Sequence, residues 1–257
     1  MFLTRIGENS KLVVNGDPSQ VDLINKGHSG LVKSKNILKD LKEIKINDFE
    51  TDQALLIECL KEVPKAKFRL DVNGGWALEE AIANVQSYES AFGSLIEYIE
   101  QPCTDFADLN SLRNNTGIKI AVDESIRKYL AGDLTRIKEV ADIAIIKWAP
   151  TGGITAALEV IEKIDLPVVI SSALDSSVGI SHGLSLAAAV PNLYGACGLG
   201  TASLLAGDVT SDSLIPINGI VNNRKVTPDR IEEFKAESGR QKWWQDRANT
   251  VYEGGLF

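Results

Sequence analysis

The chain alternates between short apolar runs and longer segments with an apolar residue at every third or fourth position. Eight short runs, most of them rich in Val and Ile, predict strands at 11–15, 43–46, 68–72, 95–100, 118–124, 143–148, 167–172 and 194–199. Most are apolar on both faces, as strands buried in a parallel sheet are. Between them, the helical spacing of apolar residues predicts helices at 77–92, 154–164 and 178–190.

The strand starts are roughly 25 residues apart, which is the length that a parallel β–α–β crossover needs. Eight such units close naturally into a barrel, so the sequence predicts an α/β fold with a TIM-like barrel. A doubly wound open sheet is the structural alternative, but the run VVNGDPSQ lacks the Gly-x-Gly-x-x-Gly fingerprint. We expect a barrel over 11–211, a short segment 1–10 before it, and a C-terminal segment 212–257 packed on it.

Composition and charge narrow the class of protein. The 257 residues include 27 Lys and Arg against 35 Asp and Glu, a formal net charge of −8. An acidic chain without basic clusters argues against nucleic acid as a partner. No apolar run reaches ~18 residues, which argues against a membrane span. Three scattered cysteines (Cys59, Cys103 and Cys197) favour a reducing compartment, so we expect a cytoplasmic protein.

Charged side chains fall at the carboxyl ends of the predicted strands, where a parallel barrel places its catalytic groups. Three successive strands end in a carboxylate, at Asp71, Glu100 and Asp123, and two others end in a lysine, at Lys45 and Lys147. A lone Asp there is often a helix cap and a lone Lys a surface residue, but joint occurrence at five ends favours a site. Three carboxylates at one mouth repel each other, and a hard cation relieves that repulsion. We therefore expect Mg²⁺ or Mn²⁺ rather than Zn²⁺.

Six runs together resemble the enolase superfamily and, within it, the o-succinylbenzoate synthase family, particularly its actinobacterial type. They are RLDVNGGW, YIEQPC, IAVDES, IIKWAPTGG, VVISSALDSSVG and ACGLGTASLLAGDV, and the resemblance covers roughly residues 42–222. Asp-x-Asn, Glu-Gln-Pro and Asp-Glu-Ser are shared across much of the superfamily, whereas SSALDSSVG and ACGLGT are more specific. The resemblance implies a (β/α)7β barrel. It also implies a Mg²⁺-dependent dehydration of 2-succinyl-6-hydroxy-2,4-cyclohexadiene-1-carboxylate to 2-succinylbenzoate in menaquinone biosynthesis.

The resemblance further implies roles for individual residues. Asp71, Glu100 and Asp123 match the family's metal ligands. Lys45 matches the lysine that abstracts the α-proton, and Lys147 matches the lysine on the far side of the substrate, which stays cationic against a metal-stabilised enediolate. The residues implied in substrate binding are Arg69, Asn73, Ser171, Ser172, Gly198 and Gly200.

The chain departs from the family pattern in two places. Glu43 stands where the family has the first lysine of a Lys-x-Lys motif, and Lys33-x-Lys35 is an alternative match. Lys45 is the better candidate because it lies 26 residues before Asp71, whereas Lys35 lies 36 before it and outside any strand-like run. Only ten residues precede the first predicted strand. We therefore expect the family's N-terminal α+β capping domain to be largely missing, or a lid to be supplied by another chain.

Three functions are compatible with these observations. The first is the dehydration of a small carboxylate. The second is racemisation of N-acylated amino acids or epimerisation of dipeptides, with the two lysines as opposed acid and base, because barrels of this superfamily host both chemistries. The third is a catalytically impaired barrel, which Glu43 and the expected lack of a cap favour. The sequence leaves monomer and homo-oligomer both open.

Overall fold

The structure is a computed structural model, and it describes residues 11–15 and 49–253. Two compact units divide the chain. The first unit consists of Met1–Ile146, Val160–Val169 and Asn192–Ala196, and the second of Lys147–Glu159, Ile170–Pro191 and Cys197–Phe257.

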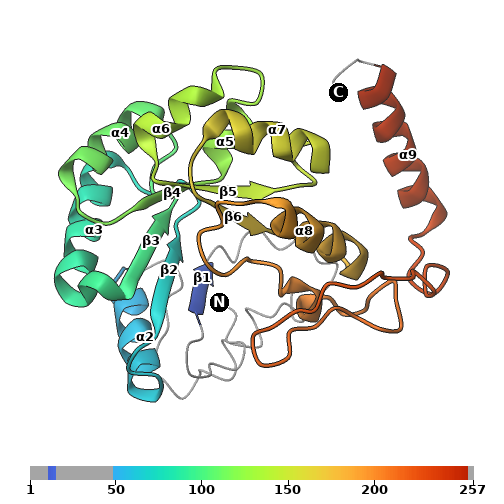
Figure 1. Cartoon of the computed structure of the whole chain (residues 1–257), viewed down its shortest axis with the longest axis horizontal. Helices are drawn as coiled ribbons and strands as arrows, with labels where there is room; N and C mark the ends of the chain where they lie inside the picture. Colours follow the sequence, from blue (N-terminus) through green and yellow to red (C-terminus); the bar gives the residue numbers. More distant parts are fainter. Residues whose placement is uncertain (1–10, 16–48, 254–257) are drawn as a thin grey trace. The chain divides into compact units, whose positions relative to one another are not determined.

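A six-stranded sheet contains β1 (Lys11–Asn15), β2 (Lys67–Asp71), β3 (Ile96–Glu100), β4 (Ile120–Val122), β5 (Ile143–Lys147) and β6 (Val168–Ser171) (Figure 1). Its strand order follows the chain from β1 to β6, and the registered pairs from β1 to β5 are parallel. A doubly wound sheet reverses its strand order at a switch point. No reversal occurs among these strands, so the order is that of a singly wound β/α barrel.

Six of the eight predicted strands are confirmed, with ends that differ by at most two residues. β1 pairs directly with β2, whereas the eight-strand prediction has 43–46 between them, and 43–46 lies outside the described residues. The predicted strand 194–199 is wrong, because within it only Gly198 forms an isolated bridge, to Ser171; a second bridge, from Leu193 to Val168, lies just before it. Gly195 takes a φ of 70°, which breaks the extended run that a ladder needs.

Helices separate the strands. The described helices are α2 (Phe49–Glu62), α3 (Leu78–Phe92), α4 (Phe106–Asn115), α5 (Glu124–Lys128), α6 (Ile137–Val140), α7 (Ile154–Ile164), α8 (Ser177–Ala189) and α9 (Ser238–Glu253). The three predicted helices are confirmed to within one residue as α3, α7 and α8. In α3, the buried residues recur at helical spacing (Ala81, Val85, Tyr88 and Phe92), so one face of the helix is apolar.

The sheet separates two apolar layers of the first unit. On one face, the ring of Phe68 in β2 meets that of Phe92 in α3 edge to face, with 6.4 Å between the ring centroids. On the other face, a buried cluster consists of Tyr98, Ala121, Ile143, Ile145 and Val169, with Tyr194 packed against it. We call the face with this cluster the inner face. Because side chains alternate along a regular strand, every second residue lies on it, and the register shift between β2 and β3 is an exception.

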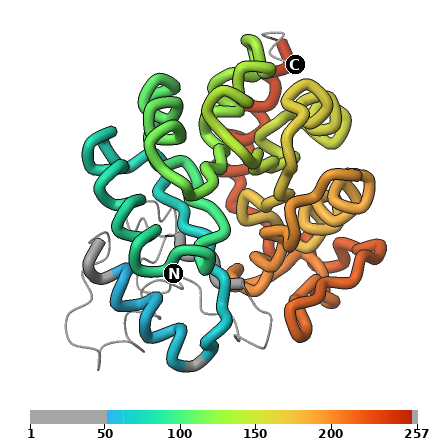
Figure 2. Tube along the Cα trace, turned by 60° about the vertical axis from the view of Figure 1, so that its left-hand side comes forward, coloured from blue at the N-terminus to red at the C-terminus, as the bar shows by residue number. Residues whose placement is uncertain are grey.

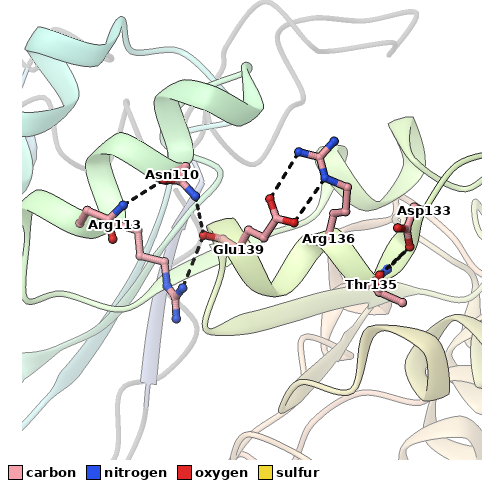
Figure 3. A network of polar contacts seen from close by, with 7 residues as sticks. Asn110, Arg113, Asp133, Thr135, Arg136 and Glu139 are labelled. Carbon is pink, nitrogen blue, oxygen red and sulfur yellow. Dashed lines mark hydrogen bonds and ion pairs between the residues drawn. The ribbon is translucent and has the colours of Figure 1, made fainter.

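Polar contacts hold neighbouring helices of the first unit together. Figures 1 and 2 show α3, α4 and α6 in succession along one side of this unit. Asn110 of α4 donates to the carbonyl of Glu139 in α6 at 3.0 Å (Figure 3). Arg113 donates to the Lys138 carbonyl at 3.1 Å. Arg113 also donates to Asp142 Oδ1 at 2.7 Å, which ties α4 to the start of β5.

The second unit contains α8, and two glycines of this helix, Gly179 and Gly183, pack closely against other side chains. A Cβ on Gly183 would lie 2.6 Å from Leu199 Cδ2, so a larger residue there would require the Leu199 side chain to shift. In contrast, α9 has no buried residue, and Trp243 and Trp244 are 46% and 53% exposed. The packing of the whole segment 212–257 on the barrel stays a prediction. Within the described ranges, no helix is long and apolar enough to cross a bilayer.

Candidate functional site

Three carboxylates lie at the carboxyl ends of successive strands in the first unit. Asp71 ends β2 and Glu100 ends β3, and the two residues are Cα partners in the parallel register. Asp123 follows directly after β4, two residues beyond Ala121, the register partner of Glu100. Asp71, Glu100 and Asp123 each stand two positions after a residue of the inner face, so alternation places all three on that face.

The carboxylates differ in their surroundings. Glu100 and Asp123 are only 8% and 2% exposed, and Asp71 is half-buried. A buried carboxylate is costly unless hydrogen bonds or a positive charge compensate it. Asp123 Oδ1 lies 3.5 Å from Arg127 Nε of α5, and Asp71 Oδ1 accepts a hydrogen bond from the Asn73 N–H at 3.0 Å. These contacts offset part of the cost of burial for Asp123 and Asp71.

The oxygen atoms of these three carboxylates are the kind of ligand that a hard divalent cation prefers. All three side chains offer carboxylate oxygens, which Mg²⁺ and Mn²⁺ prefer, and their strands are neighbours. Among residues 11–15 and 49–253, however, no group of three or more His, Cys, Asp or Glu side chains is gathered closely enough to hold a metal ion. The residues thus fit a metal site in type and in backbone placement, while their carboxylates are not gathered around one point.

The turns after β2 and β3 have unusual backbone conformations. Asn73 has a φ of 53° and Gly74 a φ of 73°, and Gln101, the residue after Glu100, has a φ of 41°. Left-handed conformations cost a residue with a Cβ roughly 1–2 kcal/mol. Such strain is found where the surroundings impose it, often at functional sites. Gln101 is absent from the set of site residues that the sequence predicts.

Arg69 occupies the inner face of β2, two residues before Asp71. Its guanidinium donates to Glu97 Oε2 at 2.7 Å and to the carbonyls of Ala196 and Tyr194 at 2.6 and 3.2 Å. It also stacks on the ring of Tyr98, 5.0 Å from the centroid. Burial raises the pKa of Tyr98 above its ordinary value, and the positive charge of Arg69 opposes that rise. These contacts are structural, and a role in substrate binding stays a prediction.

A shift of register explains how Glu97 reaches Arg69. Phe68 pairs with Ile96, but Arg69 pairs with Tyr98, so one extra residue stands on β3. Such a bulge turns a side chain away from strict alternation. Glu97 and Tyr98 therefore both contact the same guanidinium.

Of the two predicted catalytic lysines, the structure describes only Lys147. Lys147 is the last residue of β5, and its carbonyl accepts hydrogen bonds from the N–H and hydroxyl of Thr151, at 3.2 and 2.7 Å. Alternation from Ile143 and Ile145 places Lys147 on the inner face of its own strand. Lys45, with Glu43, lies outside the described residues.

The predicted substrate-binding residues of the second unit form a local cluster. The Ser172 N–H donates to the Gly198 carbonyl at 3.0 Å, and its hydroxyl is 2.5 Å from the Thr201 hydroxyl. A Cβ on Gly198 would lie 2.6 Å from Ser171 Oγ, and one on Gly200 would lie 3.0 Å from Pro216 Cγ. The structure therefore brings Ser171, Ser172 and Gly198 together, with both glycines at close contacts.

The chain matches one protein-family model and is similar to several known proteins. The family model described as enolase C-terminal domain-like matches residues 31–228. The o-succinylbenzoate synthase of Mycobacterium tuberculosis (strain ATCC 25618 / H37Rv) is 46% identical over 186 residues, covering 72% of this chain and 56% of that protein. The protein of the same name from Mycobacterium leprae (strain TN) is 46% identical over 188 residues, covering 72% and 55%. The chain thus spans just over half the length of these relatives.

Solved structures show a similar fold. The L-Ala-D/L-Glu epimerase of Bacillus subtilis matches with a TM-score of 0.57 and 27% identity, over 77% of this chain and 55% of that one. A muconate lactonizing enzyme of Pseudomonas fluorescens matches with a TM-score of 0.66 and 20% identity, over 79% and 59%. Together with the strand order, these matches show a barrel-like α/β fold.

Proposed function

Because the chain belongs to the enolase C-terminal domain-like family, we propose that it carries the barrel of an o-succinylbenzoate synthase. This carbon–oxygen lyase would convert 2-succinyl-6-hydroxy-2,4-cyclohexadiene-1-carboxylate and release water, yielding 2-succinylbenzoate for menaquinone biosynthesis. One structural observation supports the proposal most directly: carboxylates stand at the ends of three successive strands, at Asp71, Glu100 and Asp123. The 46% identity to the mycobacterial synthases favours this reaction within the family.

The carboxylates would hold the metal. Asp71, Glu100 and Asp123 supply the oxygen ligands that suit Mg²⁺, with Mn²⁺ as a substitute. When bound, the cation would offset the second negative charge that develops on the substrate carboxylate as its α-proton leaves. The inner-face placement of Asp71 and Glu100 in register supports this assignment.

The lysines would move the proton. Lys45 would take the proton from C1, next to the carboxylate, and return it to the hydroxyl leaving from C6, so that water departs and the ring becomes aromatic. A lysine can act as a base near neutral pH only if its pKa is lowered, as a neighbouring cation does. Lys147 would stay protonated and stabilise the enediolate. Ser171, Ser172, Gly198 and Gly200 would contact the succinyl end, and Arg69 and Asn73 would orient the site.

A second candidate function is the epimerisation of dipeptides or the racemisation of N-acylamino acids. The 27% identity to the Bacillus subtilis epimerase favours it. Both reactions begin with removal of an α-proton, so the same residues would serve either. Exchange of the α-proton of a dipeptide or an N-acylamino acid in D₂O, without dehydration of the cyclohexadiene, would select this second function.

The test is a dehydration assay on the purified chain with Mg²⁺, repeated with EDTA. We expect turnover that EDTA abolishes. We also expect Asp123→Asn to lower the rate by more than the roughly 10- to 100-fold that loss of a residue behind the ligands costs. Asp165→Asn is the matched control, since Asp165 is exposed and pairs with Lys138 at 2.7 Å. Absence of both turnover and Mg²⁺ binding would overturn the proposal and identify a catalytically impaired barrel.

Location and partners follow from the same proposal. The substrate is a small carboxylate, and the chain acts in the cytoplasm without nucleic acid or membrane. We expect it to act as a monomer or a homo-oligomer.

A further inference from the structure

The side chain of Gln101 bridges two strand ends in the first unit. Its Nε2 donates to the Cys103 carbonyl at 2.9 Å and to Ser125 Oγ at 2.7 Å. Its Oε1 accepts from the N–H groups of Asp123 and Ser125, at 3.2 and 3.1 Å. A primary amide has two donors and two acceptor positions, so this side chain, 1% exposed, is fully used.

The backbone of Gln101 extends the same connection to a third strand end. Its N–H donates to the Ala121 carbonyl of β4 at 2.8 Å, and its carbonyl accepts from the Gly74 N–H at 2.6 Å. Gly74 belongs to the turn that follows Asp71. Gln101 therefore contacts the turn that follows Asp71, adjoins Glu100 in the chain, and bonds to the N–H of Asp123 itself.

The backbone of Gln101 is strained in the conformation that makes these hydrogen bonds. Gln101 has a φ of 41°, in the left-handed region that favours glycine. Glycine would occupy this conformation without strain, but it would make none of the four side-chain hydrogen bonds. The backbone conformation and the buried amide together point to a requirement for the side chain at this position.

We propose that Gln101 is a positioning residue that sets the spacing of the three carboxylates and thereby the affinity of the site for a divalent cation. This inference rests on the proposed function, because it assigns the metal to Asp71, Glu100 and Asp123. Residues behind metal ligands contribute to affinity by orienting the ligands, and their loss costs roughly 10- to 100-fold. Gln101 acts on the backbones of the ligands rather than on the metal.

Two substitutions separate positioning from folding. Gln101→Met keeps the approximate size of the side chain and removes its hydrogen bonds. Gln101→Gly removes the side chain but relieves the strain at φ 41°, which offsets part of the loss in stability. The matched control is Gln53→Met, because Gln53 Nε2 also donates to a serine, Ser87, at 2.9 Å, between α2 and α3.

The experiment measures Mn²⁺ binding to the apo chain by calorimetry or paramagnetic resonance, with circular dichroism at the same temperature to establish that each variant is folded. We expect Gln101→Met and Gln101→Gly to weaken Mn²⁺ binding by roughly 10- to 100-fold and Gln53→Met to leave it unchanged. Ser125→Ala should weaken it less, and the Gln101→Met/Ser125→Ala double variant should bind no more weakly than Gln101→Met alone, because both residues belong to one connection.

The outcomes distinguish this inference from the proposed function. Wild-type chain that binds Mn²⁺, together with folded Gln101 variants of equal affinity, would overturn the role of Gln101 and leave the metal site standing. An equal loss in Gln53→Met would also overturn it, since the effect would then be general. Wild-type chain that binds no Mn²⁺ would overturn both.

Discussion

Arg69 and Glu97 form an ion pair between adjacent strands, with 2.7 Å from Nε to Oε2 and side chains that are only 4% and 16% exposed. The bulge in β3 makes this contact, because strict alternation would point Glu97 away from the layer that contains Arg69. Arg69 stands two residues before Asp71 on the same face of β2. A charge left there without its partner would be expensive.

Removing one partner of that pair should therefore destabilise the chain strongly. We expect Glu97→Ala to lower the free energy of unfolding by about 3–5 kcal/mol, because Arg69 would remain buried and lose its compensating charge. The exposed pair of Arg136 and Glu139, 3.3 Å apart (Figure 3), gives the control, and Glu139→Ala should cost about 1 kcal/mol or less. Urea denaturation measures both, and equal losses would contradict the difference in burial.

A Cβ on Gly198 should strain its contact with Ser171 and destabilise the chain. Gly198→Ala would place a methyl group 2.6 Å from Ser171 Oγ and 3.3 Å from Ser171 Cβ, and we expect a loss of about 1–3 kcal/mol in unfolding free energy. Adding Ser171→Ala should restore part of it. Gly239→Ala is the control, because nothing lies within 4 Å of its Cβ position and alanine favours the helix. A Gly198→Ala variant as stable as the control would show that the backbone or Ser171 moves to accommodate the methyl group.

Asp208 should make stability depend on pH at the acid end. Burial acts to raise the pKa of its carboxyl, but hydrogen bonds from the Ser177 hydroxyl and N–H, with others, hold that pKa below its ordinary value. Its stabilising contribution is then complete above the pKa of the unfolded chain and is lost as pH falls through the lower pKa of the folded chain. We expect Asp208→Asn to destabilise the chain at pH 7 and to cost less near pH 3. A penalty that does not shrink in acid would contradict this.

The cysteines should differ in reactivity. Burial raises the pKa of Cys103 to about 11, with Asp108 and Asp105 adding to the shift, so the thiolate that reacts is scarce at pH 8. Cys197 is half-buried. Iodoacetamide should label Cys197 at least ~10-fold faster than Cys103 in the folded chain, as followed by mass spectrometry. The two should react alike in urea, and comparable rates in the folded chain would contradict the prediction.

The strand ends could be predicted because the physics that places them is local. A Val- and Ile-rich run fixes each strand, and a charged residue where the run stops marks its carboxyl end, as at Asp71 and Glu100. The sequence pattern correctly predicted α7 at Ile154–Ile164, because its apolar residues recur every third or fourth position. The family assignment is confirmed as well, because the motifs that carry it are runs of neighbouring residues.

The contacts of Gln101 and Glu97 could not be predicted in this way. Gln101 bonds to Ser125, 24 residues away, through a backbone conformation that no local pattern favours. Glu97 faces Arg69 only because of one extra residue in the ladder. The predicted strand 194–199 failed for a related reason: the apolar residues of the run suit a strand, but Gly195 adopts a positive φ there.

The agreement between strand order and chain order has a consequence for how the molecule is made. β3, β4, β5 and β6 each join the sheet beside the strand that leaves the ribosome just before them. Each pairing from β3 onward needs only polypeptide that already exists, so the sheet can grow at one edge during translation. The strands that carry Asp71, Glu100 and Asp123 come early in that succession. The acidic strand ends can thus leave the ribosome, and their strands pair, before the residues of α7, α8 and α9 leave it.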